Sequence, residues 1–167
     1  MKTSGFPSEF TERLQKKLGS DYDAFSDAHS MPSPVSVRVN PFKKTGVFTE
    51  FEKVPWALNA FYLPERISFT LDPLFHAGCY YVQEASSMFL EQALLVAFAD
   101  VKPLRILDLC AAPGGKSTHI ASHMPEGSLL VSNEVIASRN VVLQQNISKW
   151  GADNVVVTQN EVTDFES

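Results

Sequence analysis

Two adjacent glycines beside a short apolar run are the feature of this sequence that most suggests chemistry. The turn Ala111-Ala112-Pro113-Gly114-Gly115-Lys116 directly follows a strand-like run that ends at Cys110. Adjacent glycines allow backbone conformations closed to residues with a Cβ, and they let a ligand approach the main chain closely. A helix beginning after the turn would direct free N–H groups and the positive end of its dipole at an anionic group. The turn predicts a nucleotide-like ligand, and the alternative is a plain tight connection between strand and helix.

Two glutamates give further information about the ligand that the turn would bind. Glu134 follows the second predicted strand, 19 residues after Gly115, where a carboxylate can accept both hydroxyl hydrogens of a ribose. Glu161 follows the third predicted strand, where it can accept a hydrogen bond from an adenine amino group. Each acid alone is equally typical of a solvated surface. Because neighbouring parallel strands end at the same edge of a sheet, the turn and both acids together predict an adenosine-shaped site.

Three carriers of adenosine can be compared with the turn. Gly115-Lys116-Ser117 imitates the end of a phosphate-binding P-loop, but Cys110 stands where that motif needs a glycine. The dinucleotide fingerprint G-x-G-x-x-G also fails, because no third glycine follows at the required spacing. S-adenosylmethionine is therefore the predicted cofactor. Nucleotide hydrolysis stays an alternative that requires the missing glycine.

Other reactive side chains give weaker signals. Cys110 lies inside the turn and is not expected to act as a nucleophile, and Cys79 is expected to be a small buried hydrophobic residue. His119 and His123 are four residues apart, but the sequence offers no third ligand beside them. We therefore expect no metal site.

The elements that must position these residues alternate between strand and helix beyond Pro103. Strand patterns lie at 105–110, 128–132 and 154–158, separated by helical patterns at 117–124 and 137–150. This βαβαβ alternation predicts right-handed crossovers and a parallel sheet in the order 3-2-1. The expected fold class is α/β, with one half of a doubly wound, Rossmann-like sheet.

The chain before this sheet has mixed patterns. Apolar residues at helical spacing predict a helix over 8–18, and a second short helix follows it around Tyr22. Valines alternate with polar residues over 35–39, which predicts a half-buried strand. Short strands joined by turns are expected over 42–73, and a helix over 84–98.

These patterns predict two domains. Residues 1–75 are expected to form a small α+β module of RNA-binding type, and residues 76–167 the first half of the cofactor-binding domain. In such a half sheet the first strand exposes one edge, which predicts self-association through that edge.

Composition limits the class of protein. The chain has 167 residues, of which 44% are hydrophobic and 20% charged, as in ordinary globular domains. No apolar stretch approaches the about 20 residues of a membrane-spanning helix, and no signal peptide opens the sequence, so no membrane partner is expected. Two cysteines without a second pair fit a reducing cytoplasm. The net charge of −5 argues against a surface built mainly to neutralise nucleic acid.

The run from Asp108 to Thr118 resembles the cofactor loop of the Sun (Fmu-type) family of RNA cytosine methyltransferases. Ser36–Pro41 is similar to the N-terminal strand of that family, and Gly78–Ser87 to the stretch leading into its catalytic domain. The resemblance implies a partial class I methyltransferase sheet and S-adenosyl-L-methionine as cofactor. It also implies RNA as partner, which is ribosomal RNA in the bacterial branch with this layout.

Carried over position by position, the family's contacts to S-adenosylmethionine fall on nine residues. They are Cys110, Ala111, Ala112, Pro113, Gly114, Gly115, Lys116, Glu134 and Glu161. Many members of the family carry an aspartate where Glu161 stands. In the implied reaction a cysteine thiolate adds to carbon 6 of cytosine, and the activated carbon 5 then attacks the sulfonium methyl group.

The family keeps that cysteine, and a second one in a Pro-Cys motif, beyond the third strand. We therefore expect no catalytic residue in this chain, and we interpret the chain as a fragment that is inactive alone. Lys116 is expected to neutralise the cofactor carboxylate, Arg139 to pair with Glu134 or reach RNA, and Asp108 to brace the turn through backbone N–H groups. The alternative is a non-catalytic RNA-binding or assembly module with a vestigial cofactor site.

Overall fold

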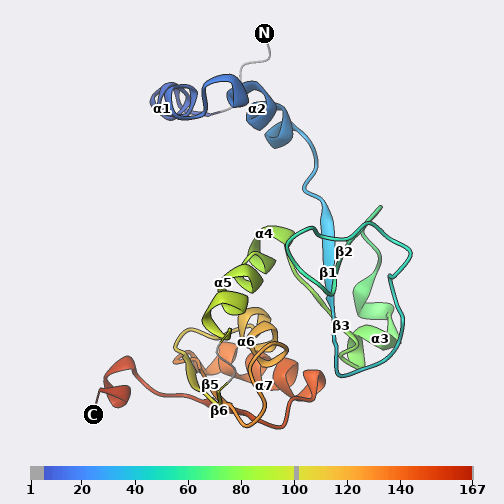
Figure 1. The fold of residues 1–167 in the computed structure, drawn as a ribbon, viewed down its shortest axis with the longest axis vertical. Helices are drawn as coiled ribbons and strands as arrows, with labels where there is room; N and C mark the ends of the chain where they lie inside the picture. Colours follow the sequence, from blue (N-terminus) through green and yellow to red (C-terminus); the bar gives the residue numbers. More distant parts are fainter. Residues whose placement is uncertain (1–5, 100–101, 167) are drawn as a thin grey trace. The chain divides into compact units, whose positions relative to one another are not determined.

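A computed structural model describes residues 6–99 and 102–166 (Figure 1). The chain divides into two compact units, one up to Pro34 and the other from Val35 onward. Among the described residues, no helix combines the length and the apolar character that crossing a bilayer requires.

The first unit consists of helices. Helix α1 (Ser8–Leu18) has the predicted bounds, and it is followed by a single 3-10 turn, η1 (Gly19–Asp21), and by α2 (Tyr22–Ser30). Aromatic rings hold these helices together, because the Phe6 ring lies 5.2 Å from that of Phe10 and 6.2 Å from that of Phe25. The two helices expected from the apolar spacing are thus confirmed.

An antiparallel sheet opens the second unit. Strand β1 (Val35–Val39) lies between β2 (Ala60–Leu63) and β3 (Tyr80–Val82). The short helices η2 (Phe69–Leu71) and α3 (Pro73–His76) connect β2 to β3. The core of this sheet includes Val37, Phe61 and Cys79, which is 4% exposed and buried as predicted.

The prediction that the strand over residues 35–39 is half-buried is wrong. Ser36 and Arg38, on its polar face, are only 3% and 2% exposed. That face packs on the parallel-sheet part of the same unit, where the Arg38 guanidinium lies 4.5 Å from the centre of the Trp150 ring. The strand therefore has two buried faces, one apolar with the valines and one polar with Ser36 and Arg38.

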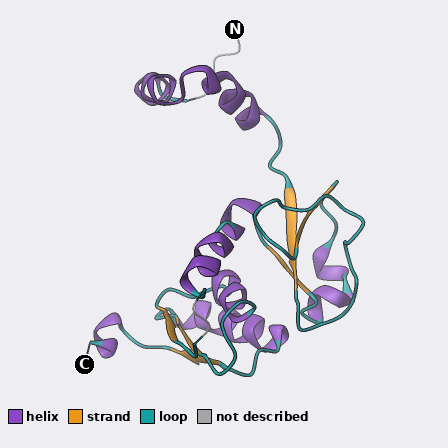
Figure 2. Ribbon diagram, in the orientation of Figure 1, coloured by secondary structure: helices purple, strands orange, loops and turns teal. Residues whose placement is uncertain are grey.

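A parallel sheet follows, and it has the predicted α/β topology. Strands β4 (Arg105–Asp108), β5 (Leu129–Asn133) and β6 (Val155–Thr158) pair in the order β4-β5-β6. Helices α6 (Gly115–Ala121) and α7 (Ala137–Trp150) form the crossovers and pack together on one face of the sheet (Figure 2). A short 3-10 turn, η3 (Val162–Phe165), follows β6.

The helix expected over 84–98 is present as two shorter helices. They are α4 (Ala85–Met88) and α5 (Leu90–Ala97), separated at Phe89. Met88 is fully buried, but Leu95, another apolar residue of the predicted helix, is 47% exposed. The change of helix at Phe89 alters which residues of α5 face inward.

The two sheets of the second unit meet at the end of α7. The Asn40 side-chain amide donates hydrogen bonds to the carbonyls of Gly78 and Trp150, both at 2.8 Å. The Lys43 ammonium donates to the carbonyls of Ala77 and Lys149. Because the last carbonyls of a helix have no partner within it, the antiparallel sheet supplies the C-terminal cap of α7.

This cap bears on the predicted division of the chain. A boundary at residue 75 would assign β3 to the cofactor-binding domain, whereas β3 pairs with β1 in the antiparallel sheet. The division into compact units lies at Pro34, before both sheets, and the functional boundary at residue 75 stays a prediction.

Replacing Gly78 tests how tightly the antiparallel sheet and α7 approach each other. Gly78 has a φ of +66°, and a Cβ on it would lie 2.0 Å from the Lys149 carbonyl oxygen. Gly46 has a similar φ of +63° but nothing within 4 Å of the added atom. We expect Gly46→Ala to lower the free energy of unfolding by about 1 kcal/mol. Gly78→Ala should lower it by about 3 kcal/mol or more. Equal losses in chemical denaturation would show that the contact is not tight.

The outer edge of β4 bears on self-association. Within the described chain β4 pairs with β5 alone, and Leu107 is 43% exposed. An unpaired edge can bond a second strand. We expect the chain to form dimers or larger species in sedimentation velocity at micromolar concentration. A monodisperse monomer would contradict this expectation.

Candidate cofactor-binding site

The turn between β4 and α6 is shaped by glycine and by backbone hydrogen bonds. Gly114 has a φ of +111°, and its N–H donates to the Ala111 carbonyl at 2.8 Å. The Thr118 hydroxyl donates to the Gly114 carbonyl, also at 2.8 Å. A Cβ on Gly114 would lie 3.4 Å from atoms of Leu143 and Asn146 on α7. These are ordinary van der Waals distances, so it is the backbone angle that favours glycine here.

The side chains of the turn divide between the core and the solvent. Ala111 and Ala112 are buried, and they pack with residues of α7. Cys110, Pro113 and Lys116 are exposed. The small alanines thus fix the turn on the protein, while the exposed residues stay accessible to a ligand.

Asp108 braces the turn differently from the expectation. Its Oδ2 accepts a hydrogen bond from the Ser117 hydroxyl at 2.7 Å, in place of the predicted backbone N–H groups. Ser117 lies in the first turn of α6 and is fully buried. The end of β4 is therefore tied to the start of α6 through two side chains.

Glu134 lies immediately after β5, and its carboxylate is only partly satisfied. The residue is 3% exposed, and Oε1 accepts a hydrogen bond from the Ile136 N–H at 3.1 Å. Oε2 is buried and has no hydrogen-bond partner within the part of the chain that the structure describes. A buried carboxylate oxygen with free acceptor capacity needs a donor, and the hydroxyl groups of a ribose are such donors. Glu134 therefore fits the predicted contact with a nucleoside.

Arg139 connects Glu134 to the turn. Its Nη2 donates to the Ala112 carbonyl at 3.0 Å and lies 3.6 Å from Glu134 Oε2. Of the two roles considered for Arg139, the structure shows the ionic contact with Glu134. The side chain is half exposed, so this contact holds the turn and the acid together from the solvent side.

Asn133 joins the ends of all three parallel strands, a role that was not predicted from the sequence. Its amide nitrogen donates to the carbonyls of Leu109, at 3.3 Å, and Asn160, at 2.9 Å. Its amide oxygen accepts from the Thr158 hydroxyl at 3.0 Å and from the Asn160 N–H at 2.8 Å. Asparagine is depleted in strands, so its place at the end of an apolar strand, beside Glu134, was the available signal.

Glu161 follows β6 as expected, but its side chain takes part in a helix cap. It accepts a hydrogen bond from the backbone N–H of Asp164, and the Glu161 N–H donates to Asp164 Oδ2 at 2.9 Å. Both acids are exposed. This capping box fixes the chain direction after β6. The contact of Glu161 with adenine stays a prediction.

The structure brings a third residue to the two histidines of α6. Glu91 on α5 lies 2.9 Å from His119 Nε2 and 3.3 Å from His123 Nε2. The Leu58 N–H also donates to Glu91 Oε1, at 2.8 Å. Glu91 and His119 are almost fully buried, and one ligand atom from each of the three side chains lies within 4.8 Å of the others. Nothing in the sequence indicated this third residue, because Glu91 is far from both histidines along the chain.

The electrostatics of this cluster favour a hydrogen-bonded network. Burial, followed by the charge of Arg38, lowers the pKa of His119 to about 4. Burial raises the pKa of Glu91, but hydrogen bonds from His119 and from the Leu58 N–H outweigh it and lower that pKa overall. His119 is thus neutral at neutral pH. Its Nδ1 is buried and has no partner among residues 6–99 and 102–166, whereas a histidine bound to metal normally donates its second N–H to an acceptor.

The fold and the site together define the class of protein. A parallel β4-β5-β6 sheet with a glycine turn after β4 and an acid after β5 is one half of a Rossmann-like sheet, a fold that binds nucleotide-like ligands at this edge. The model for the N-terminal domain of 16S rRNA methyltransferase RsmF matches residues 6–85. The model for 16S rRNA methyltransferase RsmB/F matches residues 96–167. The chain belongs to this methyltransferase family, which confirms the resemblance to the Sun family.

Individual relatives agree with this assignment. The chain is 34% identical over 170 residues to ribosomal RNA small subunit methyltransferase F of Enterobacter sp. (strain 638), and 35% identical over 169 residues to that of Erwinia tasmaniensis. Each match covers 92% of this chain and 35% of the relative, so the chain spans about a third of their length.

Solved structures show the same fold. A methyltransferase homolog protein from Pyrococcus horikoshii is 31% identical, with a TM-score of 0.76 over 94% of this chain and 53% of its own. The structure of PH0851 is 25% identical, with a TM-score of 0.71 over 93% of this chain and 36% of its own.

The pKa of His119 predicts how stability depends on pH. In the unfolded chain this histidine binds a proton below about pH 6.5, whereas in the folded chain it binds one only below about pH 4. Acidification through this range therefore lowers the free energy of unfolding, on the order of 3 kcal/mol from His119. His119→Gln, which retains a donor to Glu91, should flatten this part of the profile in urea denaturation. A profile as steep as that of the wild type would contradict the assignment.

Proposed function

We propose that this chain forms the cofactor-binding part of an RNA cytosine-C5 methyltransferase that acts on ribosomal RNA with S-adenosyl-L-methionine as methyl donor. The observation that carries the proposal is Glu134, whose buried carboxylate has an oxygen without a hydrogen-bond partner among the described residues. The family of the chain and the names of its relatives support the RNA substrate.

Residues at the three strand ends would each bind a different part of the cofactor. The turn from Cys110 to Lys116 would hold the methionine part, with the exposed Lys116 ammonium near its carboxylate. Glu134 would accept hydrogen bonds from the ribose hydroxyls, and Glu161 would approach the adenine amino group. When bound, the cofactor supplies a methyl group on a positively charged sulfur.

The nucleophile that adds to carbon 6 of cytosine is not assigned to either cysteine described here. Cys79 is buried in the core of the antiparallel sheet. Cys110 is exposed, but it lies in the turn assigned to the cofactor. What this part of the protein contributes to the reaction is therefore binding and orientation of the methyl donor.

The proposal extends to the partner and the compartment. We propose that residues 1–75 serve as an RNA-binding module, and the match of the RsmF N-terminal model to residues 6–85 supports this. We also place the protein in the cytoplasm, where both of its free cysteines would stay reduced.

Isothermal titration of the chain with S-adenosylmethionine tests the proposal. We expect saturable binding, which Glu134→Gln weakens about 10- to 100-fold because charged hydrogen bonds to the ribose are lost. The control Glu126→Gln removes the same charge from an exposed loop and should bind as the wild type does.

Two outcomes would contradict the proposal. Folded chain that gives no heat with S-adenosylmethionine, yet binds RNA, would favour the non-catalytic module with a vestigial site. ATP turnover by the chain would favour nucleotide hydrolysis.

A further inference from the structure

A cavity lies away from the predicted cofactor contacts, between the antiparallel sheet and the end of α7. Its volume is about 540 Å³, within the range of ligand-binding pockets. None of the nine residues assigned to the cofactor lines it. Its walls come from η2, α3, β3 and α7, with Phe69, Tyr81 and Trp150 among the aromatic side chains. The cavity is therefore a separate candidate site.

The charges of the cavity differ from those of the chain. The lining includes two cations, Arg66 and Lys149, and no acidic residue, although the chain has a net charge of −5. Neither cation takes part in an ion pair among the described residues. The Arg66 guanidinium lies 5.8 Å from the centre of the Phe69 ring, and the Lys149 ammonium lies 5.3 Å from that of Phe75. An anion would find both cations available.

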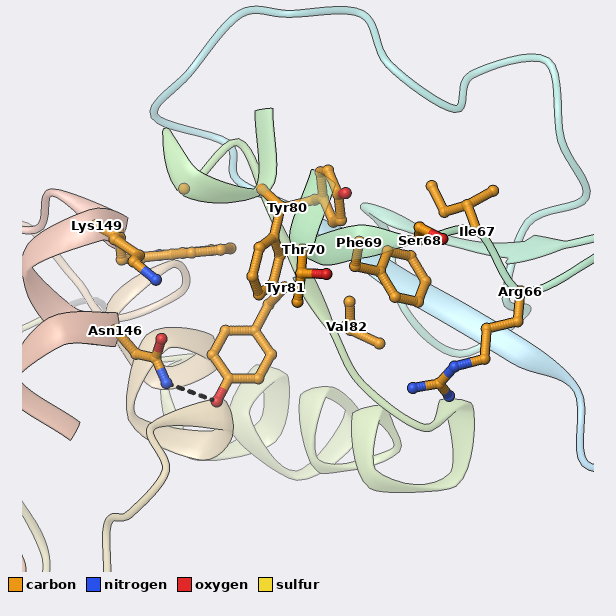
Figure 3. A pocket seen from close by; sticks show the side chains of 13 residues that line it. Arg66, Ile67, Ser68, Phe69, Thr70, Tyr80, Tyr81, Val82, Asn146 and Lys149 are labelled. Atoms are coloured by element: carbon orange, nitrogen blue, oxygen red, sulfur yellow. Dashed lines mark hydrogen bonds between the residues drawn. The ribbon is translucent and has the colours of Figure 1, made fainter. Parts of the chain in front are cut away.

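Tyr81 places an aromatic ring between these cations. Figure 3 shows Asn146 and Lys149 on one side of Tyr81, and Phe69 and Arg66 on the other. The Tyr81 hydroxyl donates to the Pro113 carbonyl at 3.2 Å and lies 3.5 Å from the Asn146 amide nitrogen. The ring is thus held by its polar end, while the side chain stays partly exposed.

We propose that this cavity binds an unstacked nucleotide of single-stranded RNA, with the base against Tyr81 and the flanking phosphates at Arg66 and Lys149. The combination of aromatic rings and unpaired cations is what single-stranded nucleic acid requires, because every base presents a π-face and every linkage a charge. The inference rests on the proposed function, since it deepens the assignment of RNA as substrate. An acidic peptide would satisfy the cations but would leave the aromatic surface unused.

The cavity is also linked to the cofactor turn. Asn146 donates to the Pro113 carbonyl at 2.7 Å, and the Tyr81 hydroxyl donates to the same oxygen. Pro113 is one of the residues assigned to S-adenosylmethionine. The cavity and the predicted cofactor site therefore share Pro113 as a neighbour. This proximity is what binding of RNA beside a methyl donor requires.

Fluorescence anisotropy with a labelled single-stranded pyrimidine octaribonucleotide tests the inference. We expect Tyr81→Leu to weaken binding about 5- to 150-fold, because stacking on one base is lost, without changing the salt dependence. Arg66→Ala and Lys149→Ala should each weaken binding and reduce the slope of log K against log salt by about 0.7, the value for one phosphate contact on a single strand.

Matched variants separate this site from general effects. Tyr81→Phe keeps the ring but removes the hydroxyl that holds it, so it should weaken binding less than Tyr81→Leu does. Lys44→Ala removes an exposed charge outside the cavity and should leave both affinity and slope unchanged. Titration with S-adenosylmethionine reports on the folding of the Arg66 and Lys149 variants, which should bind it as the wild type does.

The two proposals fail in distinguishable ways. If the wild-type chain does not bind S-adenosylmethionine, the proposed function is wrong. The cavity is not an RNA site if the chain binds S-adenosylmethionine but does not bind the oligonucleotide, or if the cavity variants bind it with wild-type affinity and slope. Equal affinity for a matched RNA duplex or for an oligoglutamate peptide would also overturn the inference.

Discussion

The capping of α7 by the antiparallel sheet is the interaction on which both candidate sites depend. The Asn40 amide and the Lys43 ammonium take up carbonyls at the end of α7 that no helical N–H can reach. Fixed in this way, α7 directs Arg139 to the turn and Asn146 to the Pro113 carbonyl. A sheet that is antiparallel and lies outside the Rossmann-like part thus determines where the residues of that part are placed.

Arg38 strengthens the same junction at a different helix. Its guanidinium is buried and donates to the Gly115 carbonyl at 3.1 Å and to the Thr118 hydroxyl at 2.6 Å, both in α6. Burial lowers the pKa of Arg38, and the nearby Tyr81 and Glu91 oppose that change. A buried charge is tolerated only where its donors are satisfied. The antiparallel sheet therefore contacts both helices that flank the cofactor turn.

The sequence was sufficient for features that depend on neighbouring residues. The α/β class, the order of the parallel strands, the bounds of α7 and the glycine turn all follow from local periodicity and from backbone requirements such as the φ of Gly114. Contacts between distant segments could not be found in this way. Glu91 reaches His119 from another helix, and Arg38 lies in a strand whose alternation suggested a solvent-exposed face.

Asn133 has a consequence for how a ligand meets the edge of the parallel sheet. Its four hydrogen bonds tie the segments after β4 and β6 to the end of β5, so displacing one segment breaks bonds to the others. The three segments therefore behave as a rigid frame. Most of the conformational entropy of this frame is lost during folding, and little remains to be lost on association. The edge is therefore preorganised for binding. Its selectivity among ligands depends on the fit of the ligand's shape more than on conformational change of the protein.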